Sequence, residues 1–273
     1  MSQTHVIALH CSGGSAGQWQ HLKRMLPGHV SLWCPHFIGS TWAGHWSGNH
    51  AFTLADEAAA IVSMIDAIGR PVHLVGHSYG GGVALRVARE RPGQIASMAL
   101  YEPTALHLLR TAGPDAKTAL DEINAISAAV DRAILAGDHR AAARQFVEYW
   151  SEPGTWGRMR NEAQADVIHY MPKACLDFRA LLLEPTPLTV YRHFRFPVLL
   201  LQGQQTREPT QVIARRLAKA LRFGSLQTVD GAGHMGPLTH AETVAALIAG
   251  FVERQDSNAD ASGDAGLTHG RAA

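Results

Sequence analysis

The chain has 273 residues, of which 46% are hydrophobic and 17% charged, which suits one large α/β domain with an inserted segment. Lysine and arginine number 24 against 23 aspartate and glutamate residues, so no net field would attract nucleic acid or an anionic membrane. The three cysteines show no C-x-x-C spacing, which argues against a disulfide scaffold. The expected partner is therefore a small-molecule substrate, with no nucleic acid and no membrane.

The N-terminus enters a predicted strand without a basic region or a long apolar stretch. We therefore expect neither a signal peptide nor a membrane anchor, and a cytoplasmic location is the default prediction. Nothing in the sequence indicates an oligomeric state.

Short apolar runs with strand character alternate with helical patterns in the first hundred residues and again near the end. The predicted strands are residues 6–9, 30–33, 72–75, 96–101, 198–201 and 226–229. This alternation predicts an α/β fold with a mostly parallel sheet that is covered by helices on both faces. Such sheets bind ligands beyond the carboxyl ends of their strands.

The alternation stops between residues 104 and 193, where only helical patterns follow one another. These patterns cover residues 118–136, 140–150 and 161–171. We expect an inserted helical cap at 104–193 and a core domain made of residues 1–103 and 194–254. The apolar side chains of the cap could pack on the core domain or contact a substrate. Residues 255–273 are small and polar, which predicts a disordered tail.

The most informative motif is Gly76-His77-Ser78-Tyr79-Gly80, which lies between a predicted buried strand and a predicted helix. A Gly-x-Ser-x-Gly pentapeptide in that context predicts a nucleophile elbow, in which the central serine is held exposed on a strained turn. A glycine-rich turn with an unreactive serine is the alternative. A serine hydroxyl is a weak nucleophile, so Ser78 needs a base, and the best candidate is His234 in the glycine-rich loop after the last predicted strand.

Three segments in this order resemble the α/β-hydrolase family: residues 9–14, with the sequence Leu-His-Cys-Ser-Gly-Gly, the serine pentapeptide, and residues 231–240 around His234. The resemblance implies the α/β-hydrolase fold, although the chain begins at what corresponds to the third strand, so the usual N-terminal hairpin is expected to be missing. It also implies an oxyanion hole made by the backbone N–H groups of Ser12 and Tyr79. Cys11, where the family usually has glycine, could alternatively be a reactive thiol.

The third member of a catalytic triad is not obvious. The family usually places an aspartate in a Gly-x-x-Asp pattern after the penultimate strand, but this chain has Thr206 there. Glu102, at the end of the strand that follows the elbow helix, is the preferred acid, and some haloalkane dehalogenases of this fold keep their acid at that location. Glu208 is the alternative acid, although a carboxylate before Pro209 can also cap a helix. Asp230, or no acid at all, is the remaining possibility.

No H-E-x-x-H or H-x-x-x-H arrangement on a predicted helix is formed by the early histidines His5, His10, His21, His36, His45 and His50, so no metal and no cofactor are expected. The favoured function is a serine hydrolase that acts on an ester or related carbonyl substrate through an acyl-enzyme on Ser78. A second hypothesis uses the same fold and triad for C–C bond hydrolysis, lyase or perhydrolase chemistry. A third is a non-catalytic member that binds a ligand.

Overall fold

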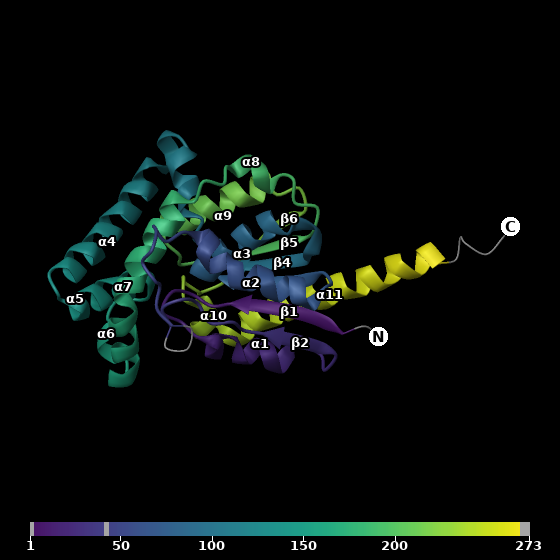
Figure 1. Cartoon of the computed structure of the whole chain (residues 1–273), viewed down its shortest axis with the longest axis horizontal. Coiled ribbons are helices and arrows are strands. Elements are labelled where there is room, and N and C mark those ends of the chain that lie inside the picture. Colours follow the sequence, from purple (N-terminus) through teal and green to yellow (C-terminus); the bar gives the residue numbers. More distant parts are fainter. Residues whose placement is uncertain (1–2, 41–43, 268–273) are drawn as a thin grey trace.

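The computed structural model describes residues 3–40 and 44–267, and a six-stranded sheet forms its centre (Figure 1). The strands are β1 (Thr4–Leu9), β2 (Val30–Trp33), β3 (Val72–His77), β4 (Ile95–Tyr101), β5 (Val198–Gly203) and β6 (Gly224–Val229). All pairs are parallel, in the order β2-β1-β3-β4-β5-β6. Each predicted apolar run lies inside one of these strands, so the predicted mostly parallel α/β sheet is confirmed.

Helices cover both faces of the sheet because successive strand residues point to opposite sides. One face packs against α2 (Leu54–Ile68), α3 (Tyr79–Glu90) and α9 (Glu208–Ala220). The other packs against α1 (Gln20–Met25) and α11 (Ala241–Leu267). In β3, for example, Leu74 packs in the core under α2, α3 and α9, and Val75 packs in the core under α1 and α11. The inner strands β1, β3, β4 and β5 are therefore buried on both faces, which explains why they contain nearly continuous apolar runs.

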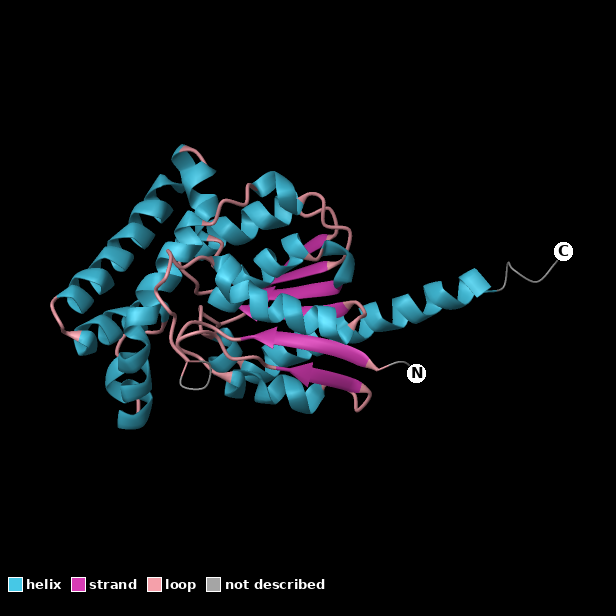
Figure 2. Ribbon diagram, in the orientation of Figure 1, coloured by secondary structure: helices cyan, strands magenta, loops and turns pink. Residues whose placement is uncertain are grey.

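Five helices lie between β4 and β5, and we call them the inserted helices. They are α4 (Lys117–Leu135), α5 (His139–Trp150), α6 (Thr155–Arg158), α7 (Asn161–Leu183) and α8 (Leu188–Tyr191). The strand arrows in Figure 2 point toward α5 and α7, so these helices lie beyond the carboxyl ends of the strands. The sequence predicts the end of this helix at residue 171, but α7 continues to Leu183 with Pro172 inside it.

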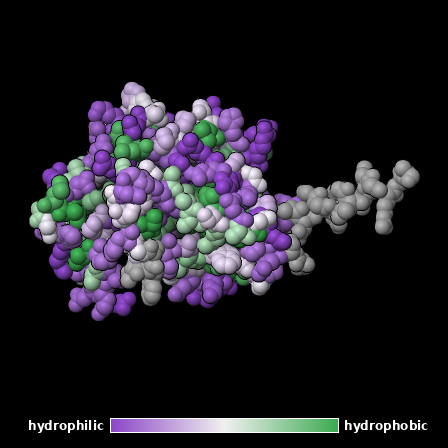
Figure 3. Space-filling model, viewed as in Figure 1, coloured by the Kyte–Doolittle hydropathy of each residue, from purple (hydrophilic) through white to green (hydrophobic). Residues whose placement is uncertain are grey.

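Four short 3-10 helices complete the connections: η1 (Ala16–Trp19), η2 (Pro92–Gln94), η3 (Leu106–Thr111) and η4 (Pro114–Ala116). After β6, two helices follow one another, α10 (Gly236–Thr239) and α11, and they are separated at His240. No helix among the described residues has the length and apolarity needed to cross a membrane. On the face seen in Figure 3, hydrophobic residues are scattered among hydrophilic ones.

The sequence predicts a disordered tail from residue 255. In the structure, α11 is described through Leu267 and projects from the body of the protein (Figure 1). The start of this extension is held by the core, because the Thr4 hydroxyl donates to the Asp256 carboxylate at 2.8 and 2.7 Å. Residues 268–273 lie outside the described residues.

Candidate active site

The loop between β3 and α3 forms the expected elbow around Ser78. Ser78 has φ 54° and ψ −117°, a conformation that costs a non-glycine residue on the order of 1–3 kcal/mol and persists only where the surroundings enforce it. Two hydrogen bonds enforce it here, since Ser78 N–H donates to the Tyr101 carbonyl at 3.0 Å and Thr104 N–H donates to the Ser78 carbonyl at 3.1 Å. A Cβ at Gly76 would lie 2.7 Å from the Gly80 carbonyl oxygen, so the motif needs glycine there.

His234 follows β6 and reaches over the end of β3 to the serine. Its Nε2 lies 2.9 Å from Ser78 Oγ, the right distance and position to accept the hydroxyl proton. Behind it, His77 Nε2 donates to the His234 carbonyl at 2.9 Å. Burial, with the nearby His234 ring, holds the pKa of His77 well below its usual value. His77 is therefore neutral and fixes the loop that carries the base.

The structure brings Glu102 to the far side of the His234 ring. Glu102 Oε2 accepts from His234 Nδ1 at 2.7 Å, and the carboxylate is fully buried. Two more donors hold it, Gly203 N–H on Oε1 at 2.7 Å and the Thr206 hydroxyl on Oε2 at 2.6 Å. The carboxylate thus fixes the tautomer in which Nε2 is free to accept a proton.

The other candidate acids lie elsewhere. Glu208 is exposed at the first position of α9, and Asp230 is exposed beyond the end of β6. Thr206 takes no charge, but its hydroxyl donates to Glu102. From the sequence, Thr206 was predicted only to be the place of a missing aspartate. Its position in the Gly-x-x-Asp pattern was the available clue that it belongs to the site.

Tyr79 is the first residue of α3, directly after Ser78, and Ser12 lies in the loop after β1. The loop of Ser12 is joined to the elbow helix by Gly80 N–H, which donates to the His10 carbonyl at 3.1 Å. Within the described residues, neither the Ser12 nor the Tyr79 backbone N–H pairs with a backbone carbonyl outside the regular helices and strands. Their assignment as the donors of an oxyanion hole stays a prediction. Burial raises the pKa of the Cys11 thiol to about 12, which argues against the reactive-thiol alternative.

A tryptophan from the inserted helices covers the base. The ring of Trp150, the last residue of α5, lies 4.3 Å from the His234 ring, centroid to centroid, with 35° between their planes. Ser78 and His234 are each only 7% exposed. Water is thus largely excluded from the serine and the imidazole, which strengthens electrostatic interactions there. Trp150 could not be distinguished from a packing residue by its sequence pattern alone.

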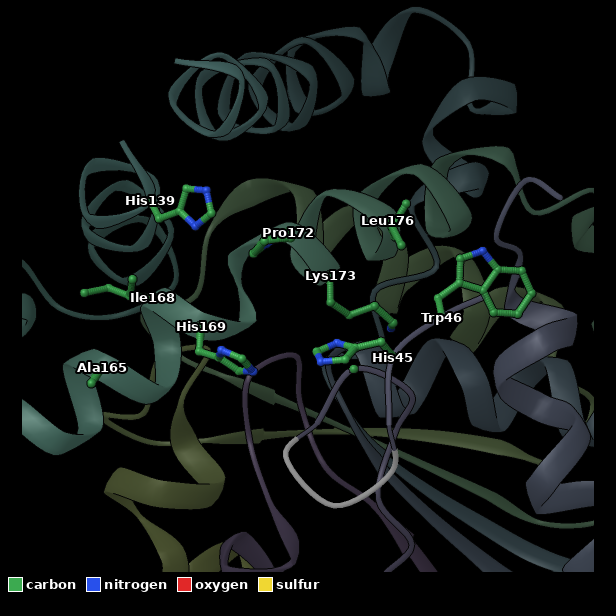
Figure 4. A pocket seen from close by; sticks show the side chains of 10 residues that line it. His45, Trp46, His139, Ala165, Ile168, His169, Pro172, Lys173 and Leu176 are labelled. Carbon is green, nitrogen blue, oxygen red and sulfur yellow. The ribbon is translucent and has the colours of Figure 1, made fainter. Parts of the chain in front are cut away.

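A pocket of about 590 Å³ lies beside the site, between the loop that carries Gly39 and Trp46 and the helices α5 and α7 (Figure 4). Its walls include His45, His169 and Lys173, together with apolar residues such as Ile168. Ser78 and His234 do not line it. No group of three or more potential metal ligands was found in the part of the chain that the structure describes.

Comparisons with known proteins agree with this architecture. Residues 6–247 match the model of the Alpha/beta hydrolase family. A pimeloyl-[acyl-carrier protein] methyl ester esterase from Methylococcus capsulatus is 28% identical over 74% of this chain and 80% of its own length. Lipase LipV from Mycobacterium tuberculosis is 32% identical, but the match covers only 36% of each protein.

Among solved structures, the α/β hydrolase MGS-M2 from a deep-sea metagenome library superposes with a TM-score of 0.78 at 15% identity, over 93% of this chain and 90% of that one. This similarity concerns the fold. The family match spans the sheet, the inserted helices and the loops that carry Ser78 and His234. The chain therefore belongs to the α/β-hydrolase family and is an enzyme of that family.

Proposed function

We propose that this protein is a serine hydrolase that cleaves an ester or related carbonyl substrate through an acyl-enzyme on Ser78. The observation that carries the proposal is the continuous hydrogen-bonded row from Glu102 through His234 to Ser78, with distances of 2.7 and 2.9 Å. A nucleophile, a base and a group that orients the base in one line define this chemistry.

In the proposed first step, Ser78 Oγ attacks the acyl carbon while its proton passes to His234 Nε2. The imidazolium that forms keeps its Nδ1–H on Glu102, whose negative charge stabilises it. The carbonyl oxygen becomes an oxyanion and accepts from the Ser12 and Tyr79 N–H groups. His234 then protonates the leaving alcohol, and a water molecule, deprotonated by the same imidazole, releases the acid from Ser78.

The substrate class follows from the surroundings and the relatives. The relatives reported above are named as a lipase and a methyl ester esterase, and the pocket beside the site combines apolar walls with a few polar groups. We propose a partly apolar small ester. We further propose that residues 1–103 and 194–254 form the catalytic core, and that residues 104–193 form a cap over it.

The test compares Ser78→Ala with Ser63→Ala. Ser63 is an exposed residue of α2 whose hydroxyl donates to the Ala59 carbonyl. On a panel of p-nitrophenyl esters, Ser78→Ala should lose about a millionfold in kcat, which leaves background hydrolysis, whereas Ser63→Ala should match the unchanged protein. A fluorophosphonate probe should label the unchanged protein and not Ser78→Ala.

Turnover that survives Ser78→Ala would disprove the proposal, as would an enzyme that is neither labelled nor active on any ester. A labelled serine without ester turnover would move the reaction to the C–C hydrolase, lyase or perhydrolase alternatives, which product analysis separates. Ligand binding without labelling would favour the non-catalytic hypothesis.

A further inference from the structure

A buried ionic cluster joins helix α7 to the loops beside Ser78. At its centre, Lys173 Nζ donates to Glu57 Oε2 at 2.9 Å and forms a close ion pair with Asp177. Tyrosine hydroxyls complete it, with Tyr170 donating to Asp177 at 2.7 Å. The members of this Lys173 cluster are Ser12, Glu57, Tyr79, Tyr170, Lys173 and Asp177.

Stability alone does not explain this cluster, because removing charged groups from water has a large free-energy cost. Lys173 and Asp177 are 6% and 2% exposed. Burial lowers the pKa of Lys173, but the charges of Asp177 and Glu57 outweigh it and hold that pKa above its usual value, so the ammonium is kept. Apolar residues of similar volume are often as stable as a buried ion group or more so. A requirement for defined positions is therefore a better reason for these charges than stability.

The cluster fixes the side chains of both expected oxyanion-hole residues. The Ser12 hydroxyl donates to Asp177 at 2.7 Å. The Tyr79 hydroxyl donates to Glu57 at 2.8 Å and accepts from Lys173 at 3.3 Å. Ser12 lies in the loop after β1 and Tyr79 is the first residue of α3. The Lys173–Asp177 pair on α7 links their side chains.

Backbone packing points the same way. A Cβ at Gly13 would lie 3.5 Å from the Tyr170 ring, so the loop after β1 rests directly on α7. One turn further along α7, Lys173 forms part of the wall of the pocket in Figure 4. Helix α7 thus contacts both the loop after β1 and the pocket.

We propose that Lys173 and Asp177 are positioning residues that hold the Ser12 and Tyr79 backbone N–H groups in the geometry of the oxyanion hole. Helix α7 is then a structural component of the catalytic apparatus as well as a cover. This inference rests on the proposed function, because it requires an oxyanion to form on attack by Ser78.

The chain offers a matched control for the first variant. Lys173–Asp177 and Lys117–Asp121 are both ion pairs four residues apart on an inserted helix, but the second is exposed at 74% and 58%. In the native protein Ser12 and Tyr170 donate to one oxygen of Asp177 and Lys173 donates to the other. Asp177→Asn keeps only one of these acceptor oxygens, so the three donors cannot all be satisfied. We expect kcat on a p-nitrophenyl ester to fall about tenfold to a hundredfold, less than the loss of a whole donor, with KM unchanged within about twofold. Asp121→Asn should change neither.

A second pair of variants separates positioning from folding. Ser12→Ala removes one hydroxyl from a half-buried loop and keeps the backbone N–H, whereas Ser12→Thr keeps a hydroxyl. Ser12→Ala should lower kcat about tenfold, and Ser12→Thr should restore most of it. Trifluoroacetophenone, whose adduct places an oxyanion in the hole, should lose affinity by the same factor as kcat/KM, because it mimics the transition state.

A merely structural cluster would lower the unfolding temperature while the folded fraction kept normal kcat and normal affinity for trifluoroacetophenone. That result, or equal kcat for Asp177→Asn and Asp121→Asn, would overturn the inference and leave the serine mechanism intact. If Asp177→Asn does not fold, the comparison of Ser12→Ala with Ser12→Thr decides alone. If Ser78→Ala remained active, the serine mechanism and this inference would both fall.

Discussion

Replacement of Glu102 by glutamine tests the acid most directly, because the structure leaves the amide no satisfactory orientation. The carboxylate now accepts from Gly203 N–H on one oxygen and from His234 and Thr206 on the other. If the amide oxygen faces Gly203, its NH2 group faces His234 and the Thr206 hydroxyl. The imidazole must then carry its proton on Nε2, where it cannot accept the proton of Ser78.

If the amide turns the other way, its NH2 group opposes the Gly203 N–H, and two buried donors face each other without an acceptor. In serine proteases the corresponding change lowers kcat about 10⁴-fold through the wrong tautomer, which corresponds to roughly 5 kcal/mol in the activation barrier. We expect Glu102→Gln to lose kcat by about the same factor while the fold is kept.

The assay is kcat on a p-nitrophenyl ester together with the thermal unfolding midpoint, with Glu208→Gln as the control, since Glu208 is exposed at the start of α9. Glu208→Gln should retain kcat within about twofold and lose at most a few tenths of a kcal/mol of helix-dipole stabilisation. A loss of less than tenfold in Glu102→Gln, or a larger loss in Glu208→Gln, would refute this reading of the site.

Three further predictions follow from particular contacts. Gly76→Ala would place a Cβ against the backbone of α3, so it should lower the free energy of unfolding by about 1–3 kcal/mol or more and abolish activity. Gly93→Ala, where no atom lies within 4 Å of an added Cβ, should change neither. Equal urea midpoints for the two variants would contradict this prediction. Burial lowers the pKa of His10 and of His107 from 6.5 to about 4, so the unfolded state binds more protons between these values and stability is lost as pH falls through that window. Each histidine should contribute a loss of at most about 2 kcal/mol in the free energy of unfolding between pH 7 and pH 5. Urea unfolding at both pH values should show a smaller change in that free energy for His107→Phe than for the unchanged protein. An equal change would be evidence against a neutral buried His107. Cys11, with a thiol pKa of about 12, should resist iodoacetamide at pH 8, and rapid carboxymethylation of Cys11 would show that its loop opens.

The sheet was predictable because its four inner strands, β1, β3, β4 and β5, are buried on both faces, so their apolar runs stand out without any knowledge of partners. Ser78 and His234 were predictable for a different reason, since the elbow requires small residues at fixed positions and the base must follow the last strand. The structure brings both together as expected. Their catalytic roles stay a prediction until Ser78→Ala is measured.

The Lys173 cluster could not be predicted from the sequence. A lysine and an aspartate four residues apart normally form a pair on a solvent-facing helix side, as Lys117 and Asp121 do. What buries Lys173 is the aromatic lining of its site, where its ammonium lies 4.4 Å from the Phe52 ring centroid, and Phe52 is far away in the chain. Burial of a charge depends on such distant partners, and helical periodicity carries no information about them.

The position of the acid follows from the neighbouring strands β4 and β5. Tyr101 pairs with Leu201, and Glu102 N–H donates to the Leu201 carbonyl at 2.9 Å, so the ends of both strands lie at the same edge, close to His234. A carboxylate can therefore reach the imidazole from either strand end. Here it comes from Glu102, and Thr206 holds it with a hydroxyl from the place where the family usually has aspartate. The unusual φ of 43° at Glu102 then has a physical reason, because the chain must turn sharply at the strand end to aim this side chain at His234.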